Sequence, residues 1–156
     1  MRNHLNREVQ AEDRTFRESE SSRLHKESLL NAVAELHSAF SEHRALDMSN
    51  LFNEDAILMF PNTQDIVGRE SIRAAFAEFM TMYRTKSFDT KQDFLDVGEQ
   101  RATSLVKFLE IRTPTEGGPT EKVYGRLLEI WELSSEGKWE IIRMMTGRFS
   151  ETEFLQ

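Results

Sequence analysis

Three charged residues lie inside apolar strands of the expected sheet, and they are the first candidates for chemistry. Lys107, Glu129 and Arg143 each have an apolar residue two positions before and two positions after. Alternate residues of a strand share one face, so each charge lies on a face with apolar side chains. Facing a pocket, any of the three would suit the role of acid, base or substrate anchor, with Glu129 and Arg143 as catalytic candidates. Facing outward, they would form solvated or interfacial ion pairs, and the sequence does not fix which residues pair across strands.

Histidines are a second source of acid–base chemistry, but they are confined to one end of the chain. His4, His25, His37 and His43 all precede residue 44, so no histidine lies on a late strand. His37 and His43 flank the apolar stripe of the expected first helix, about 120° apart at about 100° per residue, and cannot bind one metal ion together. His43 is the better candidate to reach a pocket. The alternative is that both are boundary residues with one solvated nitrogen.

Tyr83 is the remaining catalytic candidate. It follows Ile72, Phe76 and Phe79 at the spacing of one helix face. A tyrosine at the end of such a stripe packs its ring among apolar neighbours, while its hydroxyl group needs a polar partner. Tyr83 is therefore expected to contact a ligand and to offer it a hydrogen bond.

The composition excludes several classes of function. The 20 lysine and arginine residues against 27 aspartate and glutamate residues give a net charge of −7, which argues against binding to nucleic acid or to an anionic membrane. The absence of cysteine excludes disulfides, thiolate metal sites and a cysteine nucleophile. No glycine-rich nucleotide-binding motif occurs, so we expect no cofactor and no metal. The chain has no apolar run of about 18 residues and no signal peptide, which predicts a cytoplasmic protein without a membrane segment.

Helical periods occupy the first half of the chain. Apolar spacing predicts a helix over 25–46 and a short helix over 47–52 with Asp47 as its N-cap. A strand is expected over 55–61, where Pro61 ends it, followed by a loop over 62–67. Gly68 then permits the tight turn that opens a third helix.

After residue 86 the apolar period becomes two. Strands are predicted over 88–97, 102–112, 122–133 and 138–146, with a loop over 113–121 and a hairpin turn over 134–137. Helices first and strands last indicate the α+β class. Both faces of these strands are apolar: Leu105 and Leu109 lie on one face, Val106 and Phe108 on the other. Helices can cover only one face, so we expect a second subunit to cover the outer one.

Residues 1–24 differ in composition from the rest. Ten of these 24 residues are charged, and the apolar ones are too sparse to bury much area. This predicts a mobile or helical N-terminal arm over 1–24, one domain over 25–150 and a tail over 151–156. The functional alternative for the arm is a docking segment that covers a partner subunit.

Residues 51–61 read Leu-Phe-Asn-Glu-Asp-Ala-Ile-Leu-Met-Phe-Pro, residues 68–76 read Gly-Arg-Glu-Ser-Ile-Arg-Ala-Ala-Phe, and residues 137–143 read Gly-Lys-Trp-Glu-Ile-Ile-Arg. Together they resemble the nuclear-transport-factor-2-like superfamily, in particular its SnoaL-like and ketosteroid-isomerase-like branch. The resemblance implies three N-terminal helices packed on a strongly curved, mostly antiparallel sheet. This arrangement is a cystatin-like cone with one central pocket, commonly a homodimer through the outer sheet face.

The resemblance also bears on the site. Ketosteroid isomerases carry an aspartate base before the strand-ending proline and an oxyanion-donating tyrosine on the first helix. Here those positions hold Phe60 and Leu36, so that proton-shuttling arrangement is absent. The cone implies an apolar pocket instead. Its expected lining is Phe60, Phe76, Phe79, Tyr83, Trp131 and Met145, with Phe94 and Leu127 as further candidates.

Two functions are compatible with this sequence. The first is a domain that binds a small, largely apolar molecule, as an isomerase, cyclase or dehydratase of secondary metabolism. The alternative is a non-catalytic dimerisation or assembly module that uses the N-terminal arm and the outer sheet. A ligand-sized cavity with a buried ionisable group favours the first function, and a cavity filled by phenylalanine and methionine side chains favours the second.

Overall fold

The computed structural model describes the backbone of residues 2–154 and the side chains of residues 20–153. Its class is α+β, as predicted, with the long helices at the N-terminal end. The elements in chain order are α1 Arg2–Ser41, α2 Ala45–Ser49, β1 Phe52–Met59, β2 Ile66–Val67, α3 Arg69–Met82, β3 Tyr83–Val97, β4 Arg101–Pro114, β5 Glu121–Leu133, β6 Trp139–Arg148 and α4 Glu151–Phe154. None of the helices in this part of the chain is both long and apolar enough to span a membrane.

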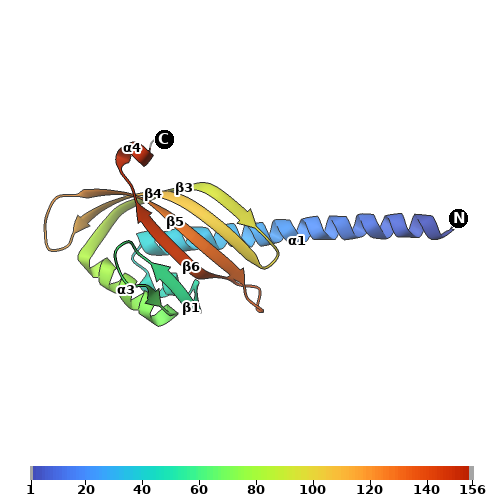
Figure 1. Cartoon of the computed structure of the whole chain (residues 1–156), viewed down its shortest axis with the longest axis horizontal. Coiled ribbons are helices and arrows are strands. Elements are labelled where there is room, and N and C mark those ends of the chain that lie inside the picture. Colours follow the sequence, from blue (N-terminus) through green and yellow to red (C-terminus); the bar gives the residue numbers. More distant parts are fainter. Residues whose placement is uncertain (1, 155–156) are drawn as a thin grey trace.

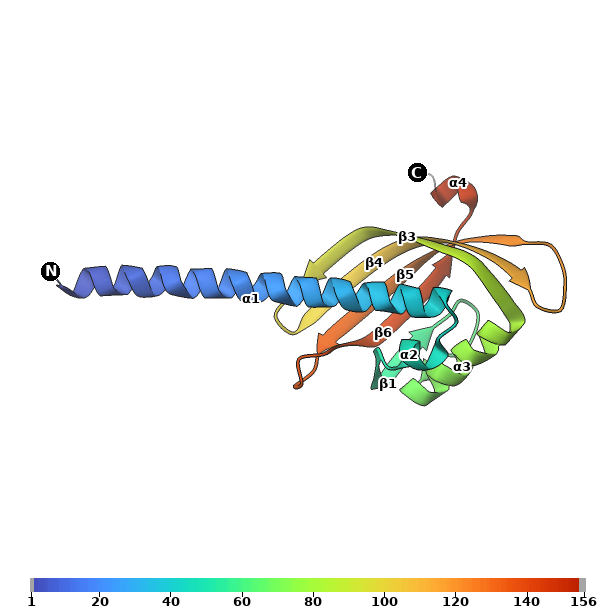
Figure 2. The ribbon, with the colours of Figure 1, turned by 180° about the vertical axis from the view of Figure 1, so that it is seen from behind.

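The strands form one mixed, curved sheet in the order β2-β1-β6-β5-β4-β3. All neighbouring strands are antiparallel except β1 and β6. Figures 1 and 2 show α1 and α3 on one face of this sheet, while the short helix α4 follows β6 on the other side, where Glu151 accepts a hydrogen bond from Tyr124 of β5. The N-terminal half of α1 extends past the sheet as a continuation of the same helix (Figure 1). A separate role for residues 1–24 remains a prediction.

The core lies between α1, α3 and the inner face of the sheet. Leu29, Val33 and Leu36 follow the helical repeat on α1 and are between 0% and 5% exposed. They pack over strand residues that are also fully buried, Phe52 of β1 and Trp131 of β5 among them. Each aromatic side chain buried in this way contributes about 1.5–3 kcal/mol relative to exposure, and this burial fixes the helices on one face.

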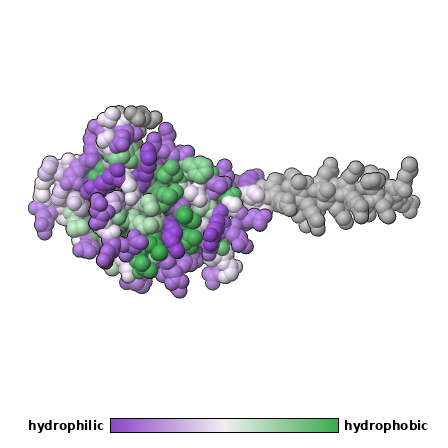
Figure 3. All heavy atoms as spheres, in the orientation of Figure 1, coloured by the Kyte–Doolittle hydropathy of each residue, from purple (hydrophilic) through white to green (hydrophobic). Residues whose placement is uncertain are grey.

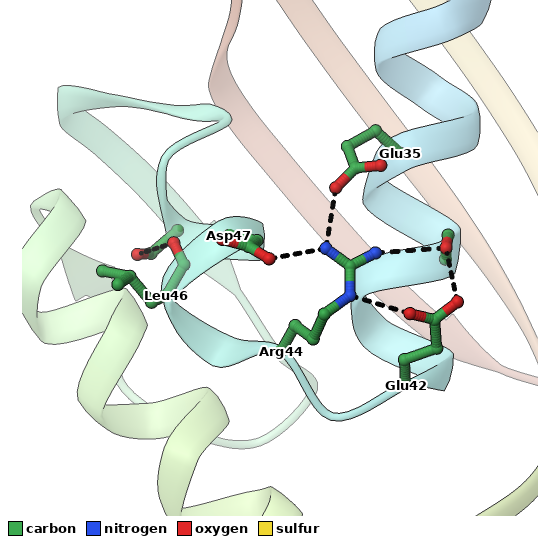
Figure 4. Close-up of polar contacts among 7 residues, drawn as sticks. Glu35, Glu42, Arg44, Leu46 and Asp47 are labelled. Atoms are coloured by element: carbon green, nitrogen blue, oxygen red, sulfur yellow. Dashed lines mark hydrogen bonds and ion pairs between the residues drawn. The ribbon is translucent and has the colours of Figure 1, made fainter.

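Arg44 joins the end of α1 to α2 through four side chains (Figure 4). Its guanidinium group donates hydrogen bonds to Glu35 at 2.9 Å, Glu42 at 2.8 Å and Asp47 at 2.6 Å, and to Ser38 Oγ at 3.2 Å. Hydrogen bonds from Ser38 and Arg44 lower the pKa of the Glu42 carboxyl group. The sharp turn between the two helices is thereby held by charge-assisted hydrogen bonds.

The prediction of Asp47 as an N-cap was wrong. Helix α2 begins earlier, at Ala45, and Asp47 lies in its first turn. The carboxylate of Asp47 accepts from Arg44 instead of capping a backbone N–H. The chain enters this turn through His43, whose φ is +59°.

Gly68 has the predicted role at the start of α3. Its φ is +93°, and its N–H donates to the Ala56 carbonyl at 2.8 Å. The expected loop before it is partly wrong, because residues 66 and 67 form the short strand β2 on β1. That pairing fixes where the chain turns into α3.

Register shifts within the sheet change which side chains face inward, and two of them bear on predicted site residues. The β3–β4 register shifts between Gln92 and Phe94, and the β5–β6 register shifts between Ile130 and Trp131. Each inserts one residue into a strand and reverses the alternation beyond it. Phe94 and Met145 therefore face outward and are 52% and 48% exposed, while Met144 faces inward and is 2% exposed.

Gly125 on β5 is required by a close approach inside the sheet. Its register partner is Phe108 of β4, whose ring covers the glycine. A Cβ atom added at Gly125 would lie 2.5 Å from Phe108 Cε1 and 2.7 Å from the Gly147 carbonyl oxygen. Contacts this short require the ring and the backbone to move.

We expect Gly125→Ala to destabilise the fold by about 1–3 kcal/mol, because the added methyl group overpacks the core. Gly147→Ala is the matched control: a Cβ atom there meets nothing within 4 Å, and its effect should stay within about 0.5 kcal/mol. Urea unfolding of the three proteins measures both values. Equal stabilities for the two variants would contradict the packing argument.

Candidate functional site

A cavity of about 710 Å³ lies between the helices and the inner face of the sheet. This volume is within the range of small-molecule sites in proteins. Its walls are mostly apolar and largely aromatic: Leu36, Phe40, Met48, Phe60, Phe76, Phe79, Phe88, Phe108, Val123, Leu127 and Met144 line it. Phe40 packs on Phe79 and on Phe88, with ring centroids 5.7 and 4.7 Å apart, respectively. These contacts hold the three rings in place along the cavity wall.

A buried carboxyl group lines this apolar cavity. Glu110 is on the inner face of β4 and is 3% exposed. Its Oε1 accepts a hydrogen bond from Thr85 Oγ1 at 3.1 Å, and its Oε2 lies 3.7 Å from Arg112 Nη1. Behind Thr85, His43 Nε2 lies 3.0 Å from the threonine hydroxyl and accepts from the Thr85 backbone N–H at 3.3 Å. We call Glu110, Thr85, His43 and Arg112 the Glu110 network.

The contacts of Arg112 with Glu121 and with the Tyr83 ring fix its guanidinium group beside Glu110. It is 4% exposed, its Nε donates to Glu121 at 3.1 Å, and its guanidinium carbon lies 3.9 Å from the centroid of the Tyr83 ring. Stacking on an aromatic ring and a carboxylate partner both stabilise a guanidinium group away from water. The positive charge is therefore fixed within a few ångströms of the Glu110 carboxyl group.

Burial raises the pKa of the Glu110 carboxyl group, and it outweighs the other influences. The charge of Arg112, the hydrogen bond from Thr85 and the charge of Arg148 act in the opposite direction. Burial also lowers the pKa of His43, which favours its neutral imidazole. A carboxyl group with a raised pKa in an apolar cavity is the arrangement from which proton transfer near neutral pH takes place.

Polar side chains from two neighbouring segments add to the lining. Because β1 and β6 are parallel, with Met59 beside Met145, the chain after β1 runs next to the end of β6. Asn62 and Thr63 come from the first segment, and Thr146 and Arg148 from the second. They offer hydrogen bonds and one positive charge to a bound molecule.

At another part of the wall, His37 of α1 approaches Glu129 of β5. The His37 Nε2 and Glu129 Oε1 atoms are 3.6 Å apart. Glu129 is 0% exposed, and its Oε2 accepts from Trp131 Nε1 at 3.0 Å. His37 lines the cavity, while Glu129 lies behind it.

The structure places the predicted lining residues in three groups. Phe60, Phe76 and Phe79 line the cavity, as does Leu127. Tyr83 stacks on Arg112 and is outside the lining. Trp131 is buried in the core, and Met145 lies on the outer face because of the irregularity in β6.

The predicted charged candidates are also separated. Glu129 faces inward and His43 belongs to the Glu110 network. Arg143 is exposed on the outer face, where its Nη1 donates to the Ile142 carbonyl at 2.6 Å. Lys107 is on that face too, with its Nζ 3.6 Å from Asp93 Oδ2. Arg143 and Lys107 therefore contribute nothing to the cavity.

Sequence reasoning missed Glu110 and Arg112, although the sequence contains a signal for them. They follow Val106 and Phe108 at intervals of two residues on β4, and all four side chains face inward. Two opposite charges that continue an apolar inward face indicate a buried ion pair. For His37 the sequence predicts only a boundary position on the first helix.

Comparisons with known proteins agree with this geometry. The family model of the SnoaL-like domain matches residues 33–142. A ketosteroid isomerase-like protein from Erwinia carotovora atroseptica is similar in structure, with a TM-score of 0.73 at 15% identity over 79% of this chain and 95% of that chain. A nuclear transport factor 2-like superfamily protein from Salmonella enterica has a TM-score of 0.71 at 14% identity, over 83% and 94%.

A third similar structure is a candidate dehydratase of the same superfamily from Streptomyces avermitilis, with a TM-score of 0.68 at 12% identity over 82% of this chain and 99% of that chain. At such identities these structures show a shared fold. No curated protein matches the chain.

The raised pKa of Glu110 predicts a pH-dependent stability difference between the wild-type protein and Glu110→Gln. A carboxyl group whose pKa is raised in the folded state stabilises the fold fully below its unfolded pKa, and this contribution is lost as pH rises through the folded pKa. The melting temperature of Glu110→Gln minus that of the wild type should therefore increase between about pH 4 and about pH 8. Thermal unfolding followed by circular dichroism measures it, and a difference that falls with pH would contradict the burial of an ionisable group here.

Proposed function

Since this chain belongs to the SnoaL-like domain family, we propose that its cavity binds a small, largely apolar molecule and that Glu110 transfers a proton to or from it. One observation carries this proposal: an ionisable carboxyl group, buried and with a raised pKa, lines an aromatic cavity of ligand size. An unfilled cavity with such a group favours the ligand-binding function over the non-catalytic assembly module.

Glu110 is suited to proton abstraction from a carbon atom next to a carbonyl group. The C–H bond breaks, its electron pair moves to the carbonyl oxygen, and the proton passes to the carboxylate. Oε1 is oriented by Thr85, which His43 holds in turn. Oε2 is beyond hydrogen-bond distance of Arg112 and is the atom that meets the substrate.

The remaining charges support the same step. Arg112 and Arg148 both act on Glu110 electrostatically. Arg148 also lines the cavity, so it can donate to an enolate oxygen as negative charge develops there. Isomerisation, aldol-type cyclisation and loss of water from a β-hydroxy ketone all begin with this abstraction. Glu110 could therefore start any of these three reaction types.

A base at the position that ketosteroid isomerases use, directly after β1 in this chain, is not needed in this scheme. Phe60 occupies that position and forms part of the apolar wall. The carboxyl group comes from β4 instead. The proposed proton-transferring residue thus lies on β4, and not at the position where ketosteroid isomerases carry their base.

Deuterium incorporation tests the proton transfer without knowledge of the natural substrate. Apolar cyclic ketones such as 1-tetralone and 2-decalone, incubated with the protein in D₂O, should exchange their α-hydrogens faster than in buffer. Glu110→Gln should lower the protein-dependent rate by about 10²–10⁴-fold, because an amide cannot take up the proton. Mass spectrometry of the ketones measures the exchange.

Glu132→Gln is the matched control, because Glu132 pairs with Arg101 at the surface and lies outside the cavity lining. It should retain the wild-type rate. Wild-type exchange in Glu110→Gln would assign the chemistry to another group. Exchange at the buffer rate with every ketone would contradict proton abstraction altogether.

We also propose that the outer sheet face forms a homodimer. The register places Phe94, Leu105, Leu128 and Met145 in one row across β3, β4, β5 and β6 on that face. Figure 3, in the view that shows this face, has apolar side chains gathered near its centre with hydrophilic groups among and around them. A second copy presents the same apolar row, and burying both removes it from water.

Sedimentation equilibrium at micromolar concentration should give twice the 18.2 kDa mass of one chain. Leu128→Glu should shift the protein to the monomer, because each subunit would then bury an unpaired charge in the interface. Leu46→Glu is the control, since Leu46 is 55% exposed on α2, away from the sheet. A wild-type monomer, or a dimer that survives Leu128→Glu, would contradict this interface.

A further inference from the structure

Polar side chains of the cavity lining gather where the cavity opens to solvent. Asn62, Thr146 and Arg148 all line the cavity, and each of them is at least partly exposed. The parallel pairing of β1 and β6 brings them together, because Met59 and Met145 are register partners and the two segments continue next to each other. We call Asn62, Thr146 and Arg148 the mouth cluster.

The mouth cluster has hydrogen-bond donors that no other side chain uses. Within the part of the chain that the structure describes, none of its three side chains forms a hydrogen bond or an ion pair. A guanidinium group consists of donors only, and the asparagine amide and the threonine hydroxyl group add further donors. The cluster is therefore rich in donors and carries one positive charge.

The charged residues of the cavity lining are positive overall. Among the described residues of the lining, Glu110 is the only acidic one, whereas Arg112 and Arg148 are both positive. Arg112 Nη1 already lies 3.7 Å from Glu110 Oε2, so Arg148 is the charge in excess. The whole chain has a net charge of −7. A positive cavity in an acidic protein draws anionic ligands to this one place.

Both sides of the mouth cluster are held by the fold. Asn62 has a φ of +61°, a backbone conformation that asparagine adopts more readily than most residues. Thr63 Oγ1 donates to the Phe60 carbonyl at 3.4 Å and closes this turn. Arg148 is the last residue of β6, where it is paired with Gly125 of β5. Little ordering of the backbone is then needed when a ligand binds.

We propose that the mouth cluster binds a carboxylate group carried by the apolar molecule in the cavity. The Arg148 guanidinium group donates to both carboxylate oxygens, and Asn62 and Thr146 donate to their remaining lone pairs. At the mouth the carboxylate keeps part of its hydration, while the apolar body is buried among the phenyl rings. The inference rests on the proposed function and narrows its ligand class to apolar carboxylic acids.

Carboxylate binding is compatible with the proposed reaction. A guanidinium group has donors on three nitrogen atoms, so Arg148 can bond a carboxylate and an enolate oxygen of the same keto acid. Arg148 also acts electrostatically on Glu110. A keto acid anchored in this way therefore has its reacting end near the carboxyl group of Glu110.

Three naphthalene derivatives test the mouth cluster. 2-Naphthoate carries the carboxylate, 2-naphthamide has a neutral group of the same shape, and naphthalene has neither. At about pH 7, where 2-naphthoate is ionised, the wild-type protein should bind it at least about tenfold more tightly than 2-naphthamide, the effect of hydrogen bonds to a charged group. Added salt should reduce this preference, because the mouth is exposed. Fluorescence titration gives the dissociation constants.

Arg148→Gln removes the charge and keeps a polar side chain, so the preference for 2-naphthoate over 2-naphthamide should fall toward one. Arg143→Gln is the matched control, because it removes the same charge from the same strand on the outer face of the sheet. It should keep the wild-type preference. Both arginines are exposed, so neither substitution should disturb the fold. Neither should change the affinity for naphthalene.

The outcomes separate the mouth cluster from the proposed function. Binding of naphthalene with equal affinities for 2-naphthoate and 2-naphthamide in the wild-type protein would overturn the inference alone. Absence of binding for all three probes would contradict apolar ligand binding and the inference with it. A preference that persists in Arg148→Gln, or that is lost equally in Arg143→Gln, would overturn the mouth cluster as the carboxylate site.

Discussion

Burial of an ionisable carboxyl group beside an apolar cavity is the constraint around which the inner face of the sheet is arranged. Glu110 is only 3% exposed there, and the chain supplies Thr85 as a donor and Arg112 as a counter-charge. Arg112 in turn needs Glu121 and the Tyr83 ring. The polar network thus reaches from the cavity wall to Glu121 at the protein surface.

The helices determine where such a group can be placed. They cover one face of the sheet, so inward-facing strand residues are buried against helix or cavity and outward-facing ones are left for water or a second subunit. On β4 this separates Glu110 and Arg112 from Lys107, although the three lie within six residues of one another. The same alternation on β5 brings Glu129 to the cone interior beside His37. The positions of the Glu110 network and of the His37–Glu129 pair are therefore both set by which strand residues face inward.

Much of the fold could be predicted from the sequence, because helical and two-residue apolar periods are local signals. The α+β class, the turn at Gly68 and strands β4, β5 and β6 were predicted within a few residues, whereas α1 begins at Arg2 instead of residue 25 and β3 begins at Tyr83 instead of residue 88. The placement of Phe94 and Met145 could not be predicted, because one inserted residue in β3 and one in β6 reverse the alternation. The meeting of His37 with Glu129 could not be predicted either, since it joins residues far apart in sequence whose contact depends on how α1 packs.

The most direct test of the central claim is the titration of Glu110 itself. Carbon-13 NMR of protein labelled at the glutamate side-chain carboxyl carbons, with the Glu110 signal assigned by its loss in Glu110→Gln, follows each group separately. The account predicts that Glu110 titrates at a higher pH than exposed glutamates, whose pKa is about 4.3, because burial raises the pKa of its carboxyl group. Titration of Glu110 together with the exposed glutamates, or below them, would contradict a carboxyl group prepared for proton transfer in this cavity.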